Sequence, residues 1–132
     1  MAGKLSSYGE LVTLNSLMRE RTVYMGLACA IINKDSKIQD VSEVTDTGYS
    51  RKQITSSTPI QEGGIGTIKN SERVEFGPWN AQQLNPITHV FITEQASGGG
   101  EIIAYAALGS SKTPHIDELV VLRENDLVIK VL

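Results

Sequence analysis

Short runs rich in β-branched and aromatic residues recur along the chain, and they predict strands. The two clearest runs, Ile87–Thr93 and Glu101–Leu108, flank Glu94–Gly100, where three consecutive glycines permit backbone angles that other residues avoid. We therefore expect a β-hairpin with an exposed, open or bulged loop. Five further runs predict strands: Thr22–Ile32, Tyr49–Ile54, Ser71–Phe76, Glu118–Leu122 and Leu127–Leu132.

Only the N-terminal part of the chain carries a helical pattern of hydrophobic residues. Ser7 and Glu10 match a capping box, and the apolar residues that follow recur at spacings of three and four: Leu11, Leu14, Leu17 and Met18. This predicts a helix over about 8–20. Such a short amphipathic helix must pack on this domain's own sheet or on a neighbouring subunit, and packing on its own sheet is the commoner outcome.

Two polar stretches separate the predicted strands. In Asn33–Gly48 the spacing of Ile38, Val41 and Val44 indicates one or two helical turns within a long connection. The segment GGIGT, which begins at Gly63, lacks the spacing of known phosphate-binding loops, so it predicts a flexible turn.

The order of these elements favours one fold class. Turn signals at short spacing and the lack of alternating strands and helices predict an antiparallel β-sandwich or a jelly-roll-like barrel. We expect an N-terminal helical arm over residues 1–21 and a β-sandwich domain over residues 22–132. Within that domain, Thr22–Ile32 is nearly continuous in apolar residues and predicts the most buried strand, while the last two strands predict a second hairpin.

Composition and charge narrow the function classes. The chain has 132 residues, 40% of them hydrophobic, which suffices for the core of one domain. With 15 acidic and 12 basic residues its formal net charge is −3, so it carries no basic surface for nucleic acid. The N-terminus lacks a signal-peptide core and no apolar run is long enough for a membrane helix, so we expect synthesis in the cytoplasm and no membrane partner.

Few residues suggest chemistry. His89 and His115 are the only histidines, and neither has the ligand spacing of a metal site. No nucleophile signature accompanies the many serines, so we expect no enzyme activity, no cofactor and no metal. Cys29 is the only cysteine and lies in an apolar run, which predicts a buried, inert residue without an intrachain disulfide.

Two larger side chains leave alternatives open. Trp79 is either an exposed anchor for a partner or a residue that closes the end of the core, and its large apolar area favours the core. Arg51 is either an interface cation or the partner of Glu72 or Glu75 on a neighbouring strand, and the strand pairing is favoured.

Three stretches together resemble a family of small virion proteins of tailed bacteriophages, which are described as tail-fibre-like or capsid cement proteins. They are TVYMGLACA from Thr22, EVTDTGYSRKQI from Glu43, and VEFGPWNAQQLNPITHVFITEQASGGGEIIAYAAL from Val74. The residues at matching places are Glu43, Val44, Gly48, Tyr49, Arg51, Phe76, Trp79, Ile87, Thr88, His89, Gly98 and Gly99. The chain departs from the family pattern at Glu94 and Gln95, where an aspartate is usual, and at MGLACA, where a more polar segment is common.

The resemblance implies a non-enzymatic building block of the virion. The first expectation is a capsid decoration protein that binds the major capsid protein, and the alternative is a tail or baseplate module for host attachment. Either role suggests a homotrimer or another cyclic oligomer. The expected contacts are the helix stripe (Leu11, Leu14, Leu17 and Met18), Trp79, and the loops Asn33–Gly48 and Thr58–Gly66. A Leu14→Glu change is then expected to weaken virion binding more than folding.

Overall fold

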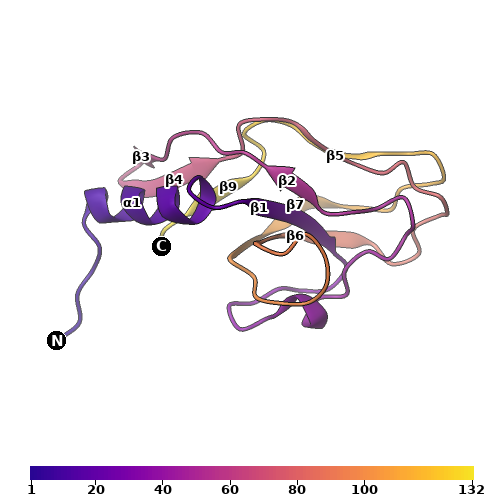
Figure 1. Cartoon of the computed structure of the whole chain (residues 1–132), viewed down its shortest axis with the longest axis horizontal. Coiled ribbons are helices and arrows are strands. Elements are labelled where there is room, and N and C mark those ends of the chain that lie inside the picture. Colours follow the sequence, from indigo (N-terminus) through magenta and orange to yellow (C-terminus); the bar gives the residue numbers. More distant parts are fainter.

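A computed structural model describes all residues, 1–132, and its architecture is mainly β with one short helix (Figure 1). The helix is α1 (Ser7–Met18), and a single 3₁₀ turn is η1 (Ile38–Asp40). The strands are β1 (Val23–Ala28), β2 (Lys52–Ile54), β3 (Ile60–Glu62), β4 (Ile65–Lys69), β5 (Val74–Phe76), β6 (Ile87–Thr93), β7 (Ala104–Lys112), β8 (Val120–Leu122) and β9 (Val128–Lys130). Every strand pairing is antiparallel, which confirms the predicted fold class.

The largest sheet has the strand order β2-β1-β6-β7, and it contains the predicted central hairpin. β6 pairs with β7, and the connecting residues Glu94–Gly99 are exposed, as predicted. The second strand of the hairpin, β7, begins later than predicted. It also continues to Lys112, because a register shift between Ile87 and His89 lets β6 pair with residues beyond Leu108. Residues Gly109–Lys112, which follow the predicted run, are therefore strand as well.

A second sheet, β3-β4-β9, contains a hairpin that the sequence pattern missed. Gly63 and Gly64 form its two-residue turn, with φ of +60° and +77°, the backbone that a tight hairpin requires. The GGIGT segment is thus a tight turn and the beginning of β4, which confirms the predicted turn but places it between two strands that the sequence pattern did not indicate.

The prediction of a C-terminal hairpin is wrong, because its two strands join different sheets. β8 pairs with β5 and β9 pairs with β4. Asn70, 1% exposed, explains the separation: its amide donates to the carbonyl of Arg123 at 3.0 Å and its oxygen accepts from the Leu127 amide at 2.8 Å. These bonds fix the turn between β8 and β9 on the β4–β5 connection.

The helix α1 packs on β4 and contacts β3. Its N-cap is Ser6, whose hydroxyl accepts from the Gly9 amide at 3.1 Å, so the predicted capping box of Ser7 and Glu10 is wrong. Glu10 instead accepts from the amide of Gly66 on β4 at 3.2 Å. The approach is close, since a Cβ at Gly66 would lie 2.7 Å from the Cβ of Glu10.

One main core unites the three sheets and the helix. It contains Leu14 and Met18 of α1 together with Met25, Phe76 and Trp79, so α1 is part of the domain's core. In Figure 1 only the residues before α1 extend away from the body, and both chain ends lie on the side of α1.

A smaller core lies on the other face of the large sheet. The Phe91 ring lies over Gly26, where a Cβ would come within 2.2 Å of it, and Ile38 and Val41 cover the ring from the long connection. β1 is therefore buried on both faces and η1 forms a helical turn, both as predicted. No helix in the structure has the length and apolarity that crossing a membrane requires.

Candidate interaction surfaces

The predicted interface stripe on α1 faces the chain's own core. Leu14 is 2% exposed and Met18 is 3% exposed, while Leu11 and Leu17 are half-buried. Leu14 and Met18 have no free surface for a partner, so a Leu14→Glu change would put a charge into the core, against the expectation that it weakens virion binding more than folding. The use of Leu11 and Leu17 in a subunit contact stays a prediction.

Three exposed apolar side chains lie in α1 or just before it. Leu5, Tyr8 and Val12 are 54%, 78% and 48% exposed. Tyr8 and Val12 are four residues apart within α1 and share one side of the helix, whereas Leu5 precedes the N-cap Ser6 and lies outside the helix.

Trp79 is fully buried, which confirms the core interpretation and leaves no exposed atom for the predicted partner contact. Its indole donates to Gln83 Oε1 at 2.9 Å, its amide donates to the carbonyl of Glu118 at 3.0 Å, and its carbonyl accepts from the Asp117 amide at 2.8 Å. Trp79 thus joins the loops 77–86 and 113–119 into one structure.

Asp46 holds the other side of the 77–86 loop. Its carboxylate accepts from the amides of Gly48, Asn80 and Ala81 at 2.8, 2.9 and 3.0 Å. These hydrogen bonds lower the pKa of Asp46, and the bond from the Asn80 amide has the largest effect. We define the loop end of the molecule as residues 46–48, 77–86 and 113–119.

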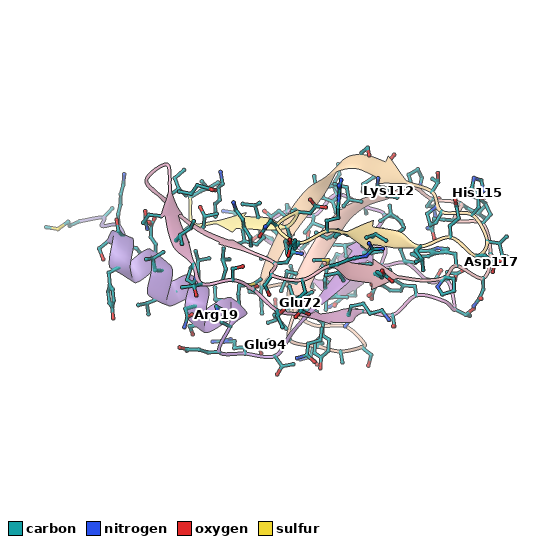
Figure 2. All side chains as sticks on the ribbon, turned by 90° about the horizontal axis from the view of Figure 1, so that it is seen from above. Arg19, Glu72, Glu94, Lys112, His115 and Asp117 are labelled. Atoms are coloured by element: carbon teal, nitrogen blue, oxygen red, sulfur yellow. The ribbon has the colours of Figure 1, made fainter.

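Figure 2 shows where the loop end lies, because its labelled residues His115 and Asp117 are at the end of the molecule opposite α1. Three apolar side chains project from these loops: Leu84 at 85%, Ile116 at 60% and Leu119 at 45% exposure. The loop end is a surface of exposed residues on a hydrogen-bonded frame, an arrangement suited to recognition by loops.

Arg51 does not pair with Glu72 or Glu75, so the favoured prediction is wrong. Its guanidinium makes two bonds of 2.8 Å to the Glu43 carboxylate, and its side chain is 3% exposed. It also donates to the carbonyls of Gln95, at 2.8 Å, and Gly98 in the central hairpin loop. Glu43 lies eight residues before Arg51 in a polar loop, where no strand or helix periodicity relates the two residues, so the sequence did not predict this pair.

Tyr49 completes the Arg51 cluster. Its hydroxyl donates to Glu43 Oε2 at 2.7 Å and accepts from the Leu27 amide at 2.9 Å. Burial raises the pKa of Tyr49, and the bond to Glu43 raises it further. The bond to Glu43 also raises the pKa of Arg51. All charges in the cluster are paired, so its effect is to hold the loop 94–100 and β1 together.

The two histidines and the cysteine lie apart from one another. His89 Nδ1 is 2.8 Å from Thr88 Oγ1, His115 is exposed on the loop end, and no three His, Cys, Asp or Glu side chains converge as metal ligands. Cys29 is half-buried, not buried as expected, because β1 ends at Ala28 and leaves the thiol beside the 77–86 loop. Partial burial raises the pKa of Cys29, which keeps the thiol protonated at neutral pH.

The outer edge of β7 borders an open groove of about 410 Å³. β8 and the turn that follows it form the opposite wall, and Lys112, Arg123 and Asp126 lie at its margin. Charged side chains beside a sheet edge discourage pairing with another strand, so the margin of this edge is protected.

Comparison with known proteins identifies the family. No curated protein matches the sequence. The family described as podophage GP4 fiber I protein gp80 matches residues 4–130, which is nearly the whole chain. The match includes α1, every sheet and the loop end, in accord with the virion-protein resemblance. The chain therefore belongs to the podophage GP4 fiber I protein gp80 family of virion structural proteins.

Proposed function

We propose that this protein is a structural subunit of a phage tail fibre. The observation that carries the proposal is the family match over residues 4–130, which names a fibre protein. Nothing in the match points to capsid decoration, the first expectation from sequence, so the tail-fibre alternative is the better supported function.

Within the fibre, we propose that the protein contacts tail proteins and copies of itself and supports host attachment without catalysis. The displaced pKa values of Asp46, Tyr49 and Arg51 each belong to groups that hold segments of the chain in place. The loop end supports an outward-facing role, because Trp79 and Asp46 hold its exposed loops in one conformation.

Quantitative mass spectrometry of separated heads and tails from purified virions tests this function. A fibre subunit is expected in the tail fraction and absent from DNA-filled heads, and gold-labelled antibody should mark the tail in electron micrographs. Recovery in many copies on heads would contradict the proposal and restore the decoration hypothesis.

Host attachment has a separate test. Phage that carry the paired Leu84→Ser and Ile116→Ser changes in the loop end should assemble normally and adsorb to host cells more slowly. The matched control is Ile60→Ser, which removes a 51% exposed side chain from β3, outside the loop end. Equal adsorption of both variants would remove the loop end from the attachment role.

A further inference from the structure

We propose that the groove between β7 and β8 binds an extended segment of a second copy of this chain, the residues Met1–Ser6 that precede α1. In this arrangement the segment is an added strand between β7 and β8. The proposal rests on the proposed function only in that a fibre is built from repeated subunits. Its evidence is the geometry of the groove and of the segment.

The groove is a gap in a ring of strands. The large sheet ends at β2 on one side and at β7 on the other, and β5 and β8 form a sheet of their own. β2 packs against β5, whereas no comparable packing joins β7 to β8. The hollow of about 410 Å³ beside β7 continues into a second one of about 300 Å³, and both are lined by Lys112, Val120 and Val121. The ring is therefore open along one line, between β7 and β8.

Both walls of the groove offer backbone groups without a partner. β7 and β8 are each the last strand of a sheet, so each has one unpaired edge, and no loop backbone bonds to either edge. Neighbouring strands lie about 4.8 Å apart, so a single strand placed between β7 and β8 can pair with both. Only an extended polypeptide presents donors and acceptors at this repeat on both of its sides. The groove is therefore suited to a strand and not to a small polar ligand.

Side chains leave the backbone of β7 accessible. β7 is nine residues long, and from Ala104 to Ser111 it has neither a charged residue nor a proline, the residues that commonly block pairing at a sheet edge. The charges at the margin belong to the end of β7 and to the opposite wall. Val90, Leu122 and Leu127 of the main core line the groove from below. An inserted strand would thus meet an apolar floor and leave its other face in water.

The segment Met1–Ser6 has the properties that such a strand needs. All six residues are exposed, and in Figure 1 the segment extends away from the body. In a strand, Met1 and Leu5 share one face and Lys4 lies on the other. Met1 and Leu5 can therefore cover the apolar floor while Lys4 stays in water. The segment spans about 20 Å when extended, which matches the length of β7 from Ala106 to Lys112.

This contact joins two different surfaces, a donated segment and an accepting groove. Each copy can then donate to one neighbour and accept from another. Contacts of this kind close into a ring or continue as a filament, whereas a contact between two identical surfaces ends at a dimer. The proposed contact is therefore compatible with a repeated assembly such as a fibre.

Analytical ultracentrifugation of the full chain tests the proposal through the backbone of Gly3. A Cβ at this position meets nothing within 4 Å in the single chain, so Gly3→Pro and Gly3→Ala both leave the fold unchanged. Proline removes an amide that the inserted strand donates, and alanine keeps it. The parent protein is expected to form an oligomer that dissociates on dilution. Gly3→Pro should raise the dissociation constant about tenfold or more, and Gly3→Ala, the matched control, should not. A parent protein that is monomeric at every concentration, or a Gly3→Pro variant with the parent's dissociation constant, would overturn the proposal.

Hydrogen exchange locates the contact. Amides of β7 and β8 should exchange about tenfold more slowly in the parent oligomer than in Gly3→Pro, because the added strand pairs with them. β3, the unpaired edge of another sheet, is the internal control and should exchange equally in both proteins. Slower exchange at β3 or at the loop end, without a change in β7 and β8, would place the contact elsewhere and refute the proposal. These solution measurements do not depend on where the protein lies in the virion, so the proposal fails separately from the tail-fibre assignment.

Discussion

The two ends of the molecule are built on different principles. At the α1 end, a regular helix packs on a hairpin through the buried Leu14 and Met18, so its stability is dominated by hydrophobic contacts. At the loop end, irregular segments are held by side-chain to backbone hydrogen bonds from Asp46 and Gln83 around one buried tryptophan.

This difference suggests a division of roles. The α1 end serves the stability of the fold, because its apolar contact with β4 gains from the exclusion of water and needs no precise polar partner. Loops on a rigid frame can change their exposed residues without loss of fold, which suits contact with variable ligands. The predictions below test whether the two ends depend on these different interactions.

The largest effect is expected at the loop end for Trp79→Ala. Removal of a fully buried tryptophan should lower the free energy of unfolding by about 4 kcal/mol, through lost burial and the cavity that remains. Urea unfolding measures the loss, and hydrogen exchange should become faster in loops 77–86 and 113–119 but not in α1. Trp79→Phe is the control and should cost less. Uniform exchange in all elements would show that the loop end is not a separate unit.

A somewhat smaller effect is expected at the α1 end for Leu14→Ala. The buried side chain should cost about 3 kcal/mol when truncated. Val12→Ala on the same helix, two residues away, is the matched control and should change stability by no more than about 0.5 kcal/mol. Chemical denaturation of the two variants and the parent protein measures both changes. Similar losses for both would contradict the distinction between the inner and outer faces.

The close approach of α1 and β4 predicts a third, intermediate effect. In Gly66→Ala the new methyl would lie 2.7 Å from the Cβ of Glu10, so helix and strand must separate. Overpacking of this kind costs about 2 kcal/mol. Gly63→Ala is a control in open space whose cost arises only from its positive φ. Thermal unfolding with helix-specific circular dichroism should show earlier loss of α1 in Gly66→Ala, and unchanged packing of the helix would contradict the geometry.

The smallest effect is expected from the titration of Asp46. Because its pKa in the folded protein is below the ordinary value of 3.8, the folded state favours the ionised form. Its contribution is therefore complete above pH 3.8 and is lost as the pH falls through the lower value. Nuclear magnetic resonance of the Asn80 and Ala81 amides should report loosening of the 77–86 loop in that range, before α1 changes. In Asp46→Asn the amides should be pH-independent, and an acid transition that persists there would contradict the assignment.

Local pattern determined much of the fold. Side-chain burial repeats with the geometry of a strand, so local pattern specified several strands. These are the alternation in Ser71–Phe76, the apolar run Thr22–Ile32, and the two runs within Ile87–Leu108 that flank the glycine loop. The helix position was correct to within two residues for the same reason. The large apolar area of Trp79 likewise indicated a core position before its surroundings were known.

Only the tertiary structure decided which strands pair and which strand α1 packs on. β8 and β9 looked like a hairpin because they are adjacent in sequence, yet the buried amide of Asn70 bonds to the turn between them and directs each strand to a different sheet. Arg51 pairs with Glu43 because the fold brings that carboxylate and two loop carbonyls to one buried point. The spacing of Leu11, Leu14, Leu17 and Met18 marks the face of α1 that packs, but it cannot say which strand that face covers. That depends on Gly66, the position at which β4 lets the helix approach, and so it is decided by packing between segments far apart in the chain.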